Sequence, residues 1–458
     1  MDKKKSEDKA LSLSSYILIG SMLFGLFFGA GNLIFPVHMG QEAGSNIFIA
    51  VAGFLIVAVG LPFLGVVALG VSKSEGLFDL ASRVNPFFGY FMTILLYLTI
   101  GPFFAIPRTA TVSFEIGIMP FIGTENIKLA LLIFTIIFFS VSLFFTLRPS
   151  KILVWVGKIL NPIFLIFLGI LIIFSLIIPM GDISVAAPIE AYKNTPFLEG
   201  ILAGYNTMDA LAALAFGIIV INTLRSLGIK SSSGIAIGTI KAGSISALLM
   251  AIIYTCLAYM GANSVEKIQI SLNGGQAMSL ISGYYFGVLG QVLLAIIITV
   301  ACLKTAIGLI IACSETFILI FPKSFSFKTY VFIFTAFSCI VANFGLSNII
   351  SFSIPVLMFL YPLAIALIML GLLSPLFKNK KCVYRSTILF TIFISFADGL
   401  KAMPEAVSGL NLILKLLELY DRYVPLFKIG MGWIVPMFVG GLIGIIISKL
   451  RERKIVNA

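Results

Sequence analysis

The chain is poor in charged residues. Only 11% of its 458 residues are charged, whereas 60% are hydrophobic and the mean hydropathy is +1.12. A soluble domain carries about a quarter charged residues, because its surface must face water. The shortage excludes an ordinary soluble fold and indicates a protein whose main solvent is lipid.

Histidine and cysteine are also scarce. The chain has one histidine, His38, and five cysteines that form no Cys-x-x-Cys pair. A single histidine excludes a histidine-based metal cluster, and cysteines within apolar segments are typical of reduced packing residues. The sequence has no P-loop, which argues against transport powered directly by ATP hydrolysis. A membrane enzyme or a channel is the less favoured class, because neither a catalytic cluster nor a continuous polar pore lining is evident.

Apolar runs long enough to cross a bilayer recur from end to end. We predict an all-α membrane protein with about twelve transmembrane helices. The predicted spans are 14–37, 46–71, 86–113, 127–147, 151–179, 197–223, 235–262, 284–320, 328–343, 346–375, 384–402 and 429–449. Because 284–320 is too long for one upright span, we expect a lead-in followed by a helix with a cytoplasmic extension.

The basic residues lie mostly at the ends of these apolar runs. Most of the 31 lysines and arginines fall in segments that share one side of the membrane if the N-terminus is cytoplasmic. The positive-inside rule then predicts that both termini are cytoplasmic. The first apolar stretch continues through GNLIFP with no cleavage site, which indicates a first helix and not a signal peptide.

The first span is interrupted by small and polar residues. LFFGAGNLIFP, from Leu26 to Pro36, contains Gly29, Ala30, Gly31 and Asn32. A broken helix frees amides that suit a carboxylate and carbonyls that suit a cation. The alternative is that the Gly-Ala-Gly segment is a close-packing face between helices.

The sixth span has a matching interruption in AGYNTMDALAALAFG, from Ala203 to Gly217. Asp209 is an ionisable group within an otherwise apolar segment, and such residues are functional candidates by default. The alternative is that Thr207 or Asp209 only caps the second half of the helix, and we favour capping combined with site-shaping.

Paired interruptions at corresponding positions predict a five-plus-five inverted repeat. We expect one transporter domain over 1–458, with a first repeat at 14–179, an inverted second repeat at 197–375 and two extra helices at 384–449. The first and sixth helices should be unwound at mid-membrane and face each other around 29–32 and 204–209.

Three segments resemble the signatures of the bacterial branched-chain amino acid:cation symporter family, within the amino acid–polyamine–cation group. They are FFGAGNLIFP, YLTIGPFFAIPRTATVSFE from Tyr97 to Glu115, and TMDALAALAFG from Thr207 to Gly217. The resemblance covers nearly the whole chain. It implies a secondary active transporter of the cell (inner) membrane that imports leucine, isoleucine and valine by alternating access with Na⁺ or H⁺.

The basic residues are not gathered on one soluble element, which argues against a nucleic-acid partner. We expect no further cofactor and no obligate protein partner. The alternative is a transporter of the same fold for another cargo, either another amino acid or a nucleobase. The resemblance also implies a substrate site in which the carboxylate meets the first break and the ammonium meets the second. The implied residues are Gly29, Ala30, Gly31, Asn32, Gly204, Tyr205, Asn206 and Thr207, with the apolar side chain against spans three and eight.

The implied cation site combines the first span with ITVACLKTAIG, from Ile298 to Gly308. Its members are Gly25, Phe28, Ala301, Lys304 and Thr305. Lys304 departs from the threonine expected there, and a lysine at mid-membrane costs roughly 2.5–3.5 kcal/mol. Either its ammonium occupies or abuts the cation site, or it turns away towards an aqueous vestibule. The first alternative slightly favours proton over sodium coupling, because burial disfavours a charged amine.

Four other charged residues stand out. Arg108 and Glu115 lie two helical turns apart on one face, which suggests a structural pair or gate. Glu315 and Asp398 lie near the ends of their spans and either face water or relay protons.

Overall fold

The computed structural model describes residues 11–122, 124–147, 161–229 and 231–456, and these residues form helices and no strands. Nine helical stretches in these ranges are long and apolar enough to cross a membrane, and three shorter apolar helices accompany them. Large apolar side chains lie on the outside, for example Phe87 at 79% and Leu319 at 81% exposure. A water-facing surface would not carry so many of them, so this surface faces lipid.

The first five predicted spans are helical in the described residues, apart from Phe28 and Gly29 in the first, Phe104 in the third and positions 178–179 in the fifth. They comprise α1 (Leu13–Phe27) with α2 (Ala30–Ala43); α3 (Ile47–Leu55) with α4 (Leu61–Ser72); α6 (Pro86–Leu98) with α7 (Ala105–Gly117); α8 (Ile127–Leu147); and α10 (Asn161–Ile177). A short helix, α5 (Leu77–Ser82), precedes α6. Positions 151–160 of the predicted fifth span lie outside the described residues.

The remaining spans follow the same order. They comprise α12 (Pro196–Tyr205) with α13 (Asp209–Ser226), α14 (Ser232–Ser264), α15 (Gly274–Ile320), α16 (Phe327–Ala342), α17 (Leu346–Leu373), α18 (Lys381–Lys401) and α21 (Ile434–Val456). Three short helices lie between them, namely α11 (Glu190–Asn194), α19 (Glu405–Ser408) and α20 (Asn411–Tyr423).

The eighth span differs from its predicted bounds. The Asn273 side chain accepts hydrogen bonds from the amides of Gly275 and Gln276 at 3.0 and 3.1 Å, so the helix begins at Gly274 and the lead-in is itself helical. Gly287 then bends α15, with a φ of 61° that a residue with a Cβ rarely adopts. α15 is therefore two helical segments, 274–286 and 288–320, and most of the predicted span 284–320 is one continuous helix.

Glycine allows the closest helix crossing near the first break. A Cβ on Gly40 of α2 would lie 2.0 Å from the carbonyl oxygen of Ala258 in α14, and one on Gly261 would lie 2.0 Å from that of Val37. Only glycine permits this approach of two backbones. The crossing holds α2 firmly against α14.

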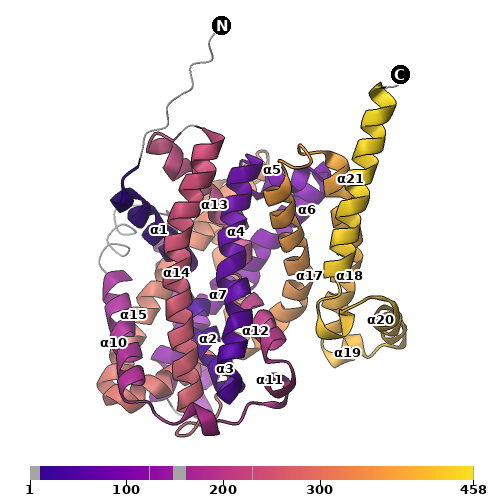
Figure 1. Ribbon diagram of the computed structural model, residues 1–458. Coiled ribbons are helices and arrows are strands. Elements are labelled where there is room, and N and C mark those ends of the chain that lie inside the picture. The colour runs from indigo at the N-terminus through magenta and orange to yellow at the C-terminus, as the bar shows by residue number, and fades with distance from the viewer. Residues whose placement is uncertain (1–10, 123, 148–160, 230, 457–458) are drawn as a thin grey trace.

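Both ends of the described chain lie at one end of the bundle (Figure 1). The start of α1 and the end of α21 are at the top of the view, whereas α11, α19 and α20 are at the bottom. The extra helices α18 and α21 pack against each other, and α18 packs on α17 at the edge of the bundle.

Candidate functional site

The first break is short and is stabilised by a hydrogen bond within the same segment of the chain. α1 ends at Phe27, Phe28 and Gly29 are extended, and α2 restarts at Ala30. The amide of Gly29 donates to the Asn32 side-chain oxygen at 3.0 Å, so the helix can restart at once. Ala30, Gly31 and Asn32 therefore form the first turn of α2, which corrects the expectation that 29–32 are unwound.

The second break spans Asn206 to Met208. Gly204 and Tyr205 remain in α12, so the unwound segment is again shorter than expected. The Thr207 hydroxyl donates to the Gly204 carbonyl at 2.9 Å, and Met208 adopts a left-handed conformation with a φ of 61°. This tight turn lets α13 begin at Asp209.

Asp209 joins three helices and does not cap its own. Its Oδ2 accepts hydrogen bonds from Asn32 Nδ2 of α2 at 2.6 Å and from the Tyr254 hydroxyl of α14 at 3.1 Å. Asn32 Nδ2 also donates to the Tyr254 hydroxyl. All three residues are buried. The expectation that Asp209 might act as a cap is wrong, because its carboxylate faces the first break; its contact with Asn32 links the two breaks directly.

Arg108 reaches the second break from α7. Its Nη1 donates to the Asn206 carbonyl oxygen at 2.6 Å and its Nη2 to Ser353 Oγ of α17 at 3.3 Å. The guanidinium lies 4.9 Å from the ring centroid of Phe35, and the residue is only 3% exposed. A buried cation thus satisfies a carbonyl that the broken helix leaves free.

Glu115 does not pair with Arg108. No ion pair joins them in the described ranges, because the guanidinium points to α12 and α17 while Glu115 lies beside Gly275 at the start of α15. Glu115 Oε2 is buried without a hydrogen-bond partner among the described residues. Arg108 and Glu115 therefore do not touch, which their spacing of two helical turns allowed.

A cavity of about 60 Å³ lies between the two breaks. Its polar lining includes Asn32, Arg108, Thr207 and Asp209, and its apolar lining comes from α1, the turn before α7, α13 and α15. Of the eight residues expected to bind substrate, five line it, namely Gly29, Ala30, Gly31, Asn32 and Thr207. The space suits roughly four to six waters. A leucine is larger, so the cavity must widen to hold one.

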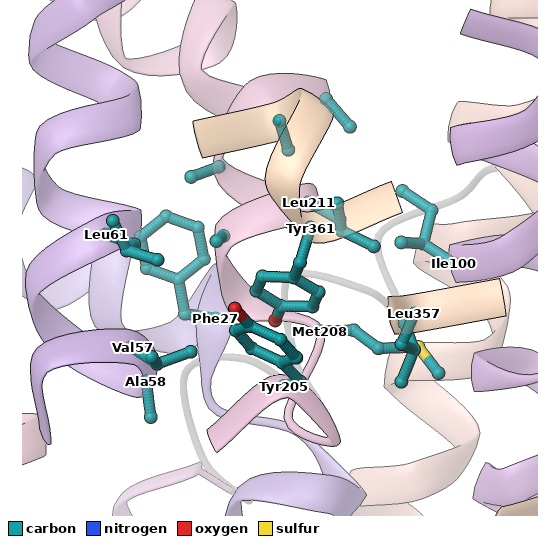
Figure 2. Close-up of a cluster of buried hydrophobic side chains, with 14 of the residues drawn as sticks. Phe27, Val57, Ala58, Leu61, Ile100, Tyr205, Met208, Leu211, Leu357 and Tyr361 are labelled. Carbon is teal, nitrogen blue, oxygen red and sulfur yellow. The ribbon is translucent and has the colours of Figure 1, made fainter. Parts of the chain in front are cut away.

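The other three expected substrate residues lie elsewhere. Gly204 packs against α3 and the turn that follows it, and Tyr205 stacks on Tyr361 with ring centroids 4.0 Å apart. Figure 2 shows these two rings among buried apolar side chains that include Phe27 and Met208. Tyr205 and Asn206 line a separate, larger cavity.

All five expected coupling residues line one further cavity. Gly25, Phe28, Ala301, Lys304 and Thr305 surround a space of about 230 Å³ between α1 and α15. The Thr305 hydroxyl already donates to the Ala301 carbonyl at 3.1 Å. No ion pair involves Lys304 within the described part of the chain. Thr305 also lines the cavity of about 60 Å³ between the two breaks, the central cavity, so the two spaces are neighbours.

The two carboxylates predicted near span ends differ in their exposure. Glu315 is exposed, whereas Asp398 is only 1% exposed, which corrects the expectation that it faces water. Asp398 is buried because α18 packs against both α17 and α21. All five cysteines are free, as expected from their spacing.

Sequence reasoning missed Tyr254 and Ser353. Tyr254 is a polar group within the apolar helix α14, 222 positions from its partner Asn32. Ser353 lies 245 positions from Arg108. A lone hydroxyl in an apolar helix gives little signal, because such groups commonly bond their own backbone.

Comparison with known proteins agrees with this architecture. A family model described as branched-chain amino acid transport protein matches residues 12–451. The branched-chain amino acid permease BrnQ of Lactobacillus delbrueckii subsp. lactis is 48% identical over 435 residues, covering 94% of this chain and 96% of its own. That of Bacillus subtilis (strain 168) is 46% identical over 445 residues, covering 97% and 99%.

Solved structures share the fold at low identity. Mhp1, a nucleobase-cation-symport-1 family transporter, in a closed conformation with bromovinylhydantoin bound, has a TM-score of 0.60 at 13% identity. The match covers 96% of this chain and 93% of Mhp1. MhsT in complex with L-phenylalanine has a TM-score of 0.51 at 16% identity, covering 97% of this chain and 99% of MhsT. With the near full-length match to the family model and the permeases, the chain belongs to the branched-chain amino acid transport protein family.

Proposed function

We propose that this protein is a secondary transporter that imports leucine, isoleucine and valine together with a cation. The observation that carries the proposal is the cavity between two broken helices, with polar groups at the breaks and apolar walls elsewhere. Such a cavity suits a small molecule with charged groups at one end and a hydrocarbon chain at the other. The relatives named as branched-chain amino acid permeases make this substrate class the first choice.

The substrate carboxylate is expected at the start of α2. The first amides of a helix have no partner within the helix, and the dipole places partial positive charge there. In α2 these amides belong to Ala30, Gly31 and Asn32, and two of these residues are too small to cover them. A Cβ on Gly31 would lie 3.7 Å from Arg108 Nη1, so the guanidinium adds positive charge beside the same position.

The substrate ammonium is expected at the carbonyl end of α12. The Asn206 carbonyl is now held by Arg108, and the Gly204 carbonyl by Thr207. We therefore assign Arg108 the role of a gate that ties α7 and α17 to the second break while the cavity is closed. Release of the Asn206 carbonyl would open the cavity and supply an acceptor for the ammonium.

The apolar walls set selectivity. Ile100 and Ala105 in the third span and Leu309 in the eighth contribute to them, as expected for a branched side chain. One methylene changes binding by only about 1–3 kcal/mol in an apolar pocket. The transporter should therefore accept all three branched-chain amino acids.

The coupling ion is assigned to the cavity that contains Lys304. Its ammonium supplies a fixed positive charge in the cavity that Gly25 and Phe28 also line, and a sodium ion bound there would be repelled. A lysine held among apolar side chains releases its proton more readily than one in water. We propose proton coupling in preference to sodium coupling, in a bacterial inner membrane with both termini cytoplasmic.

Uptake by purified protein in proteoliposomes tests the substrate. We expect tritiated leucine to accumulate under an imposed proton gradient and to be displaced by valine and isoleucine, whereas uracil should not compete. Competition by uracil without competition by valine would point to another cargo on the same fold.

A sodium titration tests the coupling. Leucine uptake should depend on pH and not on sodium at fixed membrane potential, with choline as the replacement ion. Lys304→Thr should lose the pH response. Strong sodium dependence in the wild type that persists in Lys304→Thr would place Lys304 outside the coupling site.

A further inference from the structure

A second and larger cavity adjoins the second break from the other side. Its volume is about 540 Å³, and it lies among α12, α17, α18 and the segments around 189–195 and 428–430. Asn206 connects the two cavities: its carbonyl is held by Arg108 beside the central cavity, while the residue lines the larger one.

The larger cavity has a buried acidic end. Both carboxylate oxygens of Asp398 are inaccessible and have no hydrogen-bond partner among the described residues, as is also true of Asn206 Oδ1 and the Tyr205 hydroxyl. These three residues line the cavity together. Buried polar groups without partners are rare in native proteins, and buried carboxylates are particularly costly. The arrangement calls for a ligand that donates hydrogen bonds and carries positive charge.

The nearby lysine does not fill this role. Lys401 lies one helical turn from Asp398, but its ammonium donates to the carbonyls of Phe427 and Lys428 at 3.3 and 3.0 Å. It also lies 3.9 Å from Asp421 and 5.0 Å from the Phe427 ring centroid. Two further carboxylates, Glu42 and Glu199, and a second lysine, Lys428, line the same cavity, so its lining carries three carboxylates and two lysines.

Aliphatic side chains form much of the remaining wall. It includes Leu202 of α12 and Leu357 and Met358 of α17. A bare inorganic cation would gain nothing from these side chains, whereas a branched hydrocarbon attached to an ammonium group would bury apolar surface against them. Aliphatic walls with a few convergent polar groups are typical of small-molecule sites.

We propose that this cavity is a second substrate site, which holds a branched-chain amino acid by its ammonium group at Asp398 before it passes Asn206 into the central cavity. The substrate class rests on the proposed function. The site lies beyond the central cavity, and its acidic end is supplied by α18, a helix outside the predicted inverted repeat. Ammonium donors would satisfy Asp398 and Asn206, and the side chain would lie along Leu202 and Leu357.

Tryptophan fluorescence can report this site separately from transport. The chain has 2 tryptophans, Trp155 and Trp433. Trp433 is buried and lies beside Tyr205. In a Trp155→Phe background, only Trp433 emits. The probe is 3-methylbutan-1-amine, which has the ammonium group and branched chain but no carboxylate for the central site.

We expect a saturable change in Trp433 emission with this amine, at constant ionic strength, and none with 3-methylbutan-1-ol. Asp398→Asn should raise the half-saturating amine concentration at least tenfold. Asp182→Asn is the matched control, because Asp182 is an exposed carboxylate that lines a different hollow. It should leave the titration unchanged.

Three outcomes would overturn the inference: an equal response to the alcohol, a response to sodium but not to the amine, or no response to the amine in protein that transports leucine. The comparison of the amine with the alcohol tests the site in the chain that retains Asp398, so the inference can be tested even if Asp398→Asn fails to fold. Leucine uptake measured on the same preparation separates the two proposals. A lack of leucine uptake would contradict the proposed function. The amine titration tests the second site independently of uptake.

Discussion

The two helix breaks differ in their backbone geometry and in the contacts that support them. The first has a glycine at its centre and an amide satisfied by Asn32, three residues along the same helix. The second contains no glycine, places Met208 in a left-handed conformation, and depends on Arg108 from 98 positions away to satisfy the Asn206 carbonyl. The first break is therefore supported locally and the second by tertiary packing. A break of the second kind can be released by moving another helix, which suits a gate.

The largest effect is expected at the first break, where space is essential. Gly31→Leu should abolish leucine uptake, because even a Cβ there would lie 3.1 Å from the Phe35 ring and the longer side chain must enter the cavity. Uptake in proteoliposomes is the measurement. Gly308→Leu is the control, since a Cβ there meets nothing within 4 Å and the residue is exposed. Normal uptake by Gly31→Leu would remove the first break from the substrate site.

The second-largest loss of uptake is expected on replacing Arg108, which supports the second break from another helix. Arg108→Ala leaves the buried Asn206 carbonyl without its donor, a loss of about 1–3 kcal/mol before the cavity left by the side chain is added. About 3 kcal/mol corresponds to roughly a hundredfold reduction in uptake. Arg108→Lys retains charge and one donor and should transport at an intermediate rate. Equal rates for wild type and Arg108→Ala would show that the second break stands without α7.

The link between the breaks should respond more moderately. Asp209→Asn preserves shape but replaces a charged acceptor that serves Asn32 and Tyr254. Charged hydrogen bonds exceed neutral ones by about 1–1.5 kcal/mol, so uptake should fall roughly tenfold. Thermal unfolding of the purified variant should show a lowered midpoint. An unchanged midpoint together with unchanged uptake would mean that the two breaks are not coupled through this carboxylate.

The smallest effect concerns the hydroxyl that completes this link. Tyr254→Phe removes the hydrogen bond to Asp209 and the one from Asn32. Because Asn32 and Asp209 still bond each other directly, the net loss should be about 1 kcal/mol, or a roughly fivefold loss of uptake. Tyr259→Phe on the same helix lies away from both breaks and should match wild type. If the two variants behave alike, the link rests on Asn32 and Asp209 alone.

The same contrast explains what could be predicted from the sequence. Hydropathy located the spans, and the Gly-Ala-Gly-Asn segment located the first break, because both signals lie within one helix. The partners of Arg108 and Asp209 could not be predicted, since those contacts join residues 98 and 177 positions apart and depend on how helices pack. Asp398 illustrates the same limit: its position near a span end suggested water, but packing of α18 against α17 and α21 buries it.

The extent of each break was also overestimated from the sequence. Glycine and polar residues in 29–32 and 204–209 suggested longer unwound segments than the structure has. Asn32 and Thr207 satisfy backbone groups beside each break, so the helices resume within two or three residues. Side-chain hydrogen bonds of this kind limit unwinding wherever a suitable amide or hydroxyl lies close by.

The most direct test of a substrate site between the two breaks is the structure of this protein with leucine bound. We expect the leucine carboxylate within hydrogen-bonding distance of the Ala30 and Gly31 amides, its side chain against Ile100 and Leu309, and the Arg108 contact with Asn206 released. Saturating leucine that leaves the space between α2 and α12–α13 empty, with the Arg108 contact intact, would contradict this site.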